Sequence, residues 1–355
     1  MQHRGLSAFK NPALPRFSAP AMPTIQQLLS RKARVIHSTR RSYILKRIVE
    51  FTGQRHVLYR FQNRDSADRF AETLAAASAN GALLQNPVAG PPGWIGTLIH
   101  GHWLALSFAD GDPIRAKSDD PVFKSLGESL AGLHHVSSPQ RESLLYMPKL
   151  LTPRAELGTA GTAWLAESRA RLEAIRDFRL THGDLFAGNI IVTPDGSVVL
   201  IDYELFAFDL AGVELAMVLL RDYCRRGSAA ASLLDGYLSR CDDATRQLWR
   251  EYWRDFLVAG AFRLAAHRER RGRTLARRNR RWAKWLPLPL PASRRIRNAM
   301  AANEDEMAQC TRDAARHLEI AARLVEEIVS GSANDPVTLI ARCHRKAPGV
   351  QSSRA

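Results

Sequence analysis

The stretch from Leu180 to Glu204, LTHGDLFAGNIIVTPDGSVVLIDYE, restricts the fold more than any other part of the chain. Its two short apolar runs are separated by a Pro-Asp-Gly turn, which predicts a β-hairpin. Asp184, Asn189 and Asp202 stand close to these runs. Acidic side chains held together in a partly buried site repel one another unless a positive charge lies between them. The stretch therefore predicts a hairpin beside a site for a divalent metal ion.

The spacing H-x-D-x-x-x-x-N, followed by I-D after the second strand, suits phosphoryl transfer. In such a site one carboxylate orients the acceptor hydroxyl and takes its proton, while a carboxamide and a second carboxylate hold magnesium on the nucleotide phosphates. Because Mg²⁺ takes oxygen ligands and keeps several waters, two protein ligands suffice. The alternative is that these residues only cap turns around the hairpin.

These motifs resemble the catalytic and metal-binding loops of the aminoglycoside phosphotransferase and choline kinase superfamily, which has the protein-kinase-like fold. The similarity is most specific in HGDLFAGNIIV and VVLIDYE, and LGESLAGLHHV is similar to the family's helix that ends in L-A-x-L-H. The segment VELA fits the family's D-L-A helix start, with Glu214 where Asp is usual. The resemblance covers about residues 33–222.

The resemblance implies a role for each matching residue. Asp184 would be the catalytic base, and Asn189 and Asp202 would be the magnesium ligands. His182 would order the loop, and Glu204 would contact a second metal ion or the acceptor. ATP and Mg²⁺ are the implied cofactors.

A lysine on the third strand should bind phosphates and pair with a glutamate on the following helix, here Glu72. The third expected strand, HVLYRF, has no lysine, and Arg60 stands at the expected position, on the same strand face as Leu58. Arginine also binds phosphate, although with a planar fork. Lys46 on the second strand is the alternative, and we prefer Arg60. The first turn, HSTRRS, lacks the glycines of a phosphate-covering loop.

The pattern of apolar and turn residues predicts an α+β, bilobal protein-kinase-like fold. Residues 1–24 form a disordered lead-in, and residues 25–111 form a small nucleotide-binding N-lobe with five strands and one helix. Residues 112–330 form a larger, mainly helical C-lobe with the catalytic loop and the metal and acceptor site. Residues 331–355 form a frayed tail.

The formal net charge is +16, and much of the excess lies in the basic segment, residues 265–298. Such a field attracts anions, and its mixture of arginines with Trp282 and Trp285 is typical of a segment at an anionic membrane surface. Nucleic acid is the least favoured partner, because no recognised binding motif accompanies the charge. The scattered cysteines, and the absence of a secretory signal, predict a cytoplasmic protein. For the basic segment, peripheral binding at the inner membrane face is the alternative to an exposed helix face in solvent.

We therefore expect an ATP-dependent phosphotransferase that moves the γ-phosphoryl group to a hydroxyl of an amino alcohol, an aminoglycoside or a sugar. One alternative is a kinase for an anionic lipopolysaccharide or lipid-linked saccharide at the membrane, which suits the positive charge better than a polycation does. The other is a non-catalytic, pseudokinase-type binding module that lost activity together with its lysine and glycines.

Overall fold

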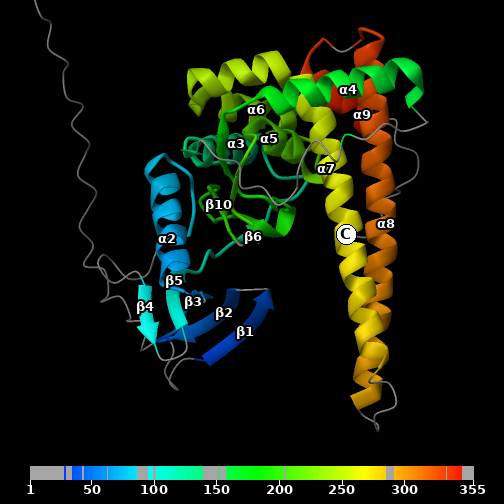
Figure 1. Ribbon diagram of the computed structural model, residues 1–355. Helices are drawn as coiled ribbons and strands as arrows, with labels where there is room; N and C mark the ends of the chain where they lie inside the picture. Colours follow the sequence, from blue (N-terminus) through cyan, green and yellow to red (C-terminus); the bar gives the residue numbers. More distant parts are fainter. Residues whose placement is uncertain are drawn as a thin grey trace, which may run out of the picture. The chain divides into compact units, whose positions relative to one another are not determined.

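The computed structural model describes residues 28, 34–41, 44–61, 63–85, 95–98, 101–138, 151, 157–203, 205–284, 292–332 and 334–345 (Figure 1). The expected lead-in, residues 1–24, lies outside this set. The chain divides into two compact units, of which the first comprises Met1–Ala71 and Asn86–Phe108 and the second Glu72–Gln85 and Ala109–Ala355. The division differs from the expected lobes, because the second half of the helix after the third strand belongs to the second unit.

The first unit is built on a five-stranded antiparallel sheet of order β1-β2-β3-β5-β4. Its strands are β1 (Arg34–Arg41), β2 (Ile44–Phe51), β3 (Gln54–Phe61), β4 (Ile95–Leu98) and β5 (Gly101–Ser107). Thr52 and Gly53 join β2 to β3 with φ angles of 50° and 79°. Positive φ at both central residues is the geometry that a two-residue turn needs to match the twist of its strands.

The two faces of this sheet carry different apolar groups. One face has a buried cluster of Leu28, Val49, Leu58, Trp103 and Ala105. On the other face, the rings of Tyr59 and Phe61 contact Phe70 of α2 (Arg64–Ala79). Because successive residues of a strand point to opposite faces, β3 contributes to both layers.

The second unit is mainly helical (Figure 1). Its helices are α3 (Asp120–His134), α4 (Gly158–Ala174), α5 (Ala211–Leu219), α6 (Gly227–Arg240), α7 (Asp243–Ala283), α8 (Ala292–Val329) and α9 (Pro336–Arg345). Two small antiparallel sheets accompany them, of order β10-β9-β6 and β11-β8-β7. Their strands are β6 (Asp112–Pro113), β7 (Ser137–Ser138), β8 (Phe178–Thr181), β9 (Ile190–Val192), β10 (Val198–Leu200) and β11 (Ala207–Asp209).

Two glycines let α3 and α6 approach each other closely. A Cβ on Gly127 would lie 2.1 Å from the carbonyl oxygen of Leu233, and a Cβ on Gly236 would lie 2.2 Å from that of Lys124. No side chain fits at either position without moving the backbone, so the two helices pack backbone to backbone. This contact holds α3 in place, and His134, the last residue of α3, belongs to the site described below.

Helices α7 and α8 lie side by side over much of their length, shown in yellow and orange in Figure 1. A buried polar pair fixes their register, because Asn303 donates to the side-chain oxygen of Asn279 at 2.6 Å and Asn279 donates to the carbonyl oxygen of Met300 at 3.1 Å. Helix α7 ends at Ala283, before the proline-rich run that the sequence predicts to break it. Helix α8 begins at Ala292.

The expectation of a frayed tail is wrong for residues 336–345, which form α9. Leu339, Ile340 and Cys343 on this helix are buried. Their spacing puts them on one apolar face, which explains why a short helix is stable there. None of the helices in the described part of the chain is both long and apolar enough to cross a membrane.

Candidate active site

The predicted hairpin is present and brings two of the predicted site residues together. Strands β9 and β10 pair antiparallel with Ile190 opposite Leu200. Asn189 therefore precedes one strand where Ile201 follows the other, and the amide of Ile201 donates to the carbonyl oxygen of Asn189 at 3.0 Å. Asp202 comes next in the chain, so Asn189 and Asp202 lie at the same end of the hairpin.

Two side-chain hydrogen bonds tie the loop that carries Asp184 to this end of the hairpin. The Nδ2 of Asn189 donates to the carbonyl oxygen of Asp184 at 2.8 Å, and the Nε2 of His182 donates to the carbonyl oxygen of Ile201 at 2.8 Å. Asn189 is buried, whereas Asp184 and Asp202 are partly exposed. The loop and the end of the hairpin thus form one hydrogen-bonded unit with two carboxylates at its surface.

Asp202 adopts an unusual backbone conformation, with φ at 68°. This left-handed region is uncommon for residues other than glycine, although Asp and Asn enter it more readily than most. Such conformations cost of order 1–3 kcal/mol and cluster at functional sites. The surrounding hydrogen bonds hold the aspartate in a conformation that the isolated chain would rarely adopt.

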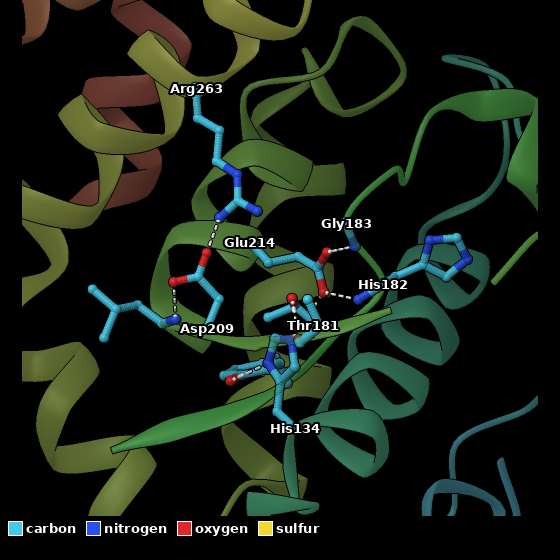
Figure 2. A network of polar contacts seen from close by, with 10 residues as sticks. His134, Thr181, His182, Gly183, Asp209, Glu214 and Arg263 are labelled. Atoms are coloured by element: carbon cyan, nitrogen blue, oxygen red, sulfur yellow. Dashed lines mark hydrogen bonds and ion pairs between the residues drawn. The ribbon is translucent and has the colours of Figure 1, made fainter. Parts of the chain in front are cut away.

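Glu214 of α5 fixes the start of the loop, and Figure 2 shows its carboxylate facing the backbone amides of His182 and Gly183. Its carboxylate accepts hydrogen bonds from the backbone amides of His182, at 2.8 Å, and Gly183, at 2.6 Å. The Nε2 of His134 lies 3.2 Å from the same carboxylate, and the Nδ1 of His134 lies 2.8 Å from the hydroxyl of Tyr237. One buried carboxylate therefore connects α3, α5 and the loop.

Gly183 is required at its position for two reasons. Its φ is 80°, and a Cβ there would lie 2.6 Å from the carbonyl oxygen of Leu205. A side chain would have both the wrong backbone conformation and no space. The glycine in the H-G-D motif therefore allows the sharp turn that presents Asp184.

The ionisation of these groups follows from their surroundings. Burial opposes the charge on Glu214, but the hydrogen bond with His134, together with the hydrogen bond from the amide of Gly183, holds its pKa below the usual value. Burial lowers the pKa of His182, which keeps its imidazole neutral despite the nearby carboxylates. The rings of Tyr203 and Phe206 meet this imidazole edge-on. A neutral, enclosed His182 can donate from Nε2 and brace the loop, and it is poorly suited to proton transfer.

A second buried ion pair, which the sequence did not reveal, anchors β11 to α7. Arg263 donates from Nη1 to Asp209 at 2.6 Å, and Asp209 also accepts from the amide of Leu210 at 2.8 Å (Figure 2). Both side chains of the pair are at most 5% exposed. Arg263 interrupts the apolar run FLVAGAFRLAA, and a lone charge inside a buried helix face is the signal that could have identified it.

The nucleotide-binding residues require a correction. Arg60 shares a face with Leu58, as expected, and its guanidinium lies 5.9 Å from the ring centroid of Trp103. That face is opposite to the one that contacts Phe70 of α2, so the expected orientation of Arg60 toward the helix is wrong. Residues paired across antiparallel strands share a face, so the partner of Tyr59 on β2 lies on the face that contacts Phe70.

Lys46 pairs with Tyr59 in the sheet and its ammonium lies 5.9 Å from the Tyr59 ring centroid. Tyr59 contacts Phe70, so Lys46 lies on the face of the sheet that α2 contacts. Glu72 is exposed on α2. Glu204 lies outside the described residues.

A cavity of about 380 Å³ lies beside the loop, within the second unit. Phe186 and Ala187, which stand between Asp184 and Asn189, form part of its wall, and residues of α7 and α8 form another part. The hydroxyl of Tyr223, also in the wall, donates to the carbonyl oxygen of Leu185 at 3.1 Å. This cavity could not be predicted from local sequence patterns, because the residues that line it are spread from position 114 to position 317.

The donor atoms at the hairpin fit magnesium. Asn189 and Asp202 offer carboxamide and carboxylate oxygens, the ligand type that Mg²⁺ prefers. Because the Nδ2 of Asn189 is bonded to Asp184, its Oδ1 is the atom that a cation could use. In the described part of the chain no group of three or more His, Cys, Asp or Glu side chains could hold a metal ion.

Solved structures of known proteins are similar to this chain over most of its length. A structure of spectinomycin phosphotransferase APH(9)-Ia with ADP and spectinomycin is 12% identical, with 89% of this chain and 92% of that chain covered and a TM-score of 0.47. An ethanolamine kinase of Plasmodium vivax is 13% identical, with 78% and 83% covered and a TM-score of 0.44. The choline kinase LicA of Streptococcus pneumoniae is 13% identical, with 80% and 96% covered and a TM-score of 0.44.

No curated protein sequence matches the chain significantly. The model of one protein family, described as the phosphotransferase enzyme family, matches residues 25–252. This match spans well over half of the chain and includes the loop, the hairpin and Glu214. The chain belongs to the phosphotransferase enzyme family.

Proposed function

We propose that this phosphotransferase moves the γ-phosphoryl group of ATP to a hydroxyl group of a small molecule. Asp184 would align the acceptor hydroxyl and take its proton. The observation that carries the proposal is the hydrogen-bonded unit of loop and hairpin, in which Asn189 holds the backbone of Asp184 and His182 holds that of Ile201. Preorganised groups of this kind favour phosphoryl transfer, which depends mainly on positioning and electrostatics.

Asn189 and Asp202 would hold Mg²⁺. The ion, when bound, supplies positive charge to the phosphate oxygens during transfer. The positive φ of Asp202 supports a functional role, because residues held in this conformation cluster at functional sites. The side chain of His182 would act on the reaction only through the position of the loop.

For the nucleotide phosphates we propose Lys46 in place of Arg60, since Lys46 is on the α2 side of the sheet. The variant Lys46→Met should raise the KM for ATP at least about tenfold, the value of one hydrogen bond to a charged group. Arg60→Met provides the matched control and should change the KM little. A large effect of Arg60→Met with none of Lys46→Met would reverse the assignment.

The overall proposal is tested by ADP formation with Mg²⁺, ATP and a library of hydroxylated acceptors. We expect at least one acceptor to support turnover, and Asp184→Ala to abolish it. Asp195→Ala, at an exposed carboxylate in the turn of the same hairpin, is the control and should leave turnover in place. Absence of ADP with every acceptor would instead favour the non-catalytic, pseudokinase-type alternative.

Binding of the basic segment, residues 265–298, to an anionic membrane is a separate proposal. In its described part Arg271 is bonded to Glu306 of α8, but the more distal Arg277, Arg281 and Lys284 are exposed. The guanidinium of Arg278 lies 4.2 Å from the ring centroid of Trp282, an arrangement that also suits a membrane interface. Flotation with anionic liposomes should recover the protein at low salt and not at high salt. Recovery at neither salt concentration would remove the proposal.

A further inference from the structure

We infer that the acceptor of this enzyme is an anionic hydroxyl compound, a sugar or polyol that carries a phosphate or carboxylate group, bound in the cavity beside the loop of Asp184. The inference rests on the proposed function for its catalytic part, but the anion-binding part can be tested without catalysis. It narrows the expected acceptors and disfavours amino alcohols and aminoglycosides.

The cavity lies beside the segment from Asp184 to Asn189. Its wall includes Phe186 and Ala187, which lie within the segment from Asp184 to Asn189. Tyr223 in the same wall is bonded to the carbonyl oxygen of Leu185. A molecule in this cavity therefore lies against the segment that carries the proposed base. The volume of about 380 Å³ is that of a small-molecule site.

The charge of the wall is the second argument. Five arginines line the cavity against two aspartates, and the wall is therefore cationic. Both aspartates are already paired, Asp222 with Arg316 and Asp313 with Arg268. The arginines of the wall are Arg115, Arg221, Arg225, Arg268 and Arg316.

Arg221 is the third and strongest argument. It is 9% exposed and no carboxylate among the described residues forms an ion pair with it. Within the same part of the chain its Nε has no hydrogen-bond partner. Burial lowers the pKa of this arginine, the charge of Arg268 lowers it further, and the nearby carboxylates of Asp184 and Asp222 only partly offset the effect.

A buried guanidinium without a partner is costly, and an anion that enters the cavity would relieve that cost. Arginine binds phosphate and carboxylate with paired, charge-assisted hydrogen bonds. Arg225, which is exposed on the same wall, also has no ion-pair partner among the described residues. An ammonium group would meet only repulsion from these two side chains.

The test compares ligands that share a ring and differ in charge. Glucose 6-phosphate, glucuronate, glucose and glucosamine are titrated into the full-length protein by calorimetry without ATP, and inorganic phosphate serves as a probe that is independent of sugar shape. We expect each anion to bind at least about tenfold more tightly than glucose. Glucosamine should bind most weakly of the four sugars. Binding should weaken as salt is raised. Equal binding of all four sugars, or preference for glucosamine, would overturn the inference.

Variants identify the cavity as the place of binding. Arg221→Gln and Arg225→Gln should each weaken anion binding at least about tenfold. The control Arg250→Gln removes the same charge from an exposed position on α7 outside the cavity and should change nothing. Because Arg221 is buried and its replacement could disturb folding, Arg225→Gln at the exposed rim provides an independent result. Full anion affinity in Arg225→Gln and in folded Arg221→Gln would overturn the inference.

The two proposals fail in different ways. Anion binding that depends on Arg221, without ADP formation from any acceptor, would remove the proposed function and leave the anion site. ADP formation that prefers glucose or glucosamine to the anionic sugars would leave the proposed function and remove the anionic acceptor.

Discussion

The buried carboxylate of Glu214 provides a sharp test of how the site is held together. The replacement Glu214→Gln keeps the size and shape of the side chain but turns one acceptor oxygen into an amide group. In the native site both oxygens accept, from the amides of His182 and Gly183, and His134 lies within reach of one of them. Whichever way the glutamine amide turns, it faces at least one donor.

The size of the effect follows from these contacts. A buried donor without an acceptor costs about 1–3 kcal/mol, and the remaining bonds weaken when their acceptor loses its charge. Relief from burying a carboxylate offsets part of this loss. We therefore expect the free energy of unfolding to fall by about 2–3 kcal/mol. Because the loop of Asp184 starts at Gly183, kcat should also fall at least about tenfold.

Urea unfolding, monitored by circular dichroism, measures the stability change. Glu304→Gln, at an exposed position of α8, is the control and should alter stability by less than about 0.5 kcal/mol. The folded-state pKa of Glu214 is below its unfolded value, so its contribution is present above about pH 4.5 and is lost as pH falls further. If Glu214→Gln behaves like the control, the carboxylate does not hold the loop and our account of the site is wrong.

Two further predictions concern the helices of the second unit. Burial, followed by the charges of neighbouring arginines, lowers the pKa of His267 and His317 to about 3. The unfolded chain therefore takes up protons below about pH 6.5 that the folded protein does not. Below that pH each histidine reduces the free energy of unfolding by up to about 1.4 kcal/mol per pH unit. The urea midpoint of the wild type should therefore decrease when the pH is lowered from 7.5 to 5.5, and it should decrease less in His317→Gln. An unchanged wild-type midpoint would refute this. Asn303→Leu should cost about 2 kcal/mol by leaving the buried Asn279 without its partner. The double variant Asn279→Leu with Asn303→Leu should recover most of that loss, and simple additivity in the thermal unfolding data would contradict a coupled pair.

Much of the catalytic loop and hairpin could be predicted from sequence because its information is local. Turn residues between two apolar runs specify the hairpin, and pairing of Ile190 with Leu200 then places Asn189 and Asp202 at one end. The resemblance to a known family added roles to these positions, and the family match agrees with it.

The face of the sheet on which α2 lies could not be predicted from the sequence, for a physical reason. The alternation of a single strand gave the face that Arg60 shares with Leu58, but it could not say which face the helix covers. That depends on the register of β2 against β3 and on the contact of Phe70 with Tyr59. Sequence reasoning within one strand contains neither fact.

The polar contacts from distant elements were also beyond local patterns. Glu214 reaches the amides of a loop more than thirty positions earlier, and Arg263 meets Asp209 from another helix. The cavity collects Arg221 and His317 from segments far apart in the chain. Such sets are defined only by tertiary packing, whereas the basic segment visible in the sequence suggested a charged surface without indicating a cationic cavity next to Asp184.

We propose above all that Asn189 and Asp202, at the end of the hairpin, form a site for magnesium with a nucleotide. Titration calorimetry of ATP into the wild-type protein, with Mg²⁺ and with a chelator, measures this directly. We predict binding that requires Mg²⁺, that weakens at least about tenfold in Asp202→Ala and that is unchanged in Asp195→Ala. ATP binding that is equally strong in the chelator, or no ATP binding under either condition, would contradict the claim.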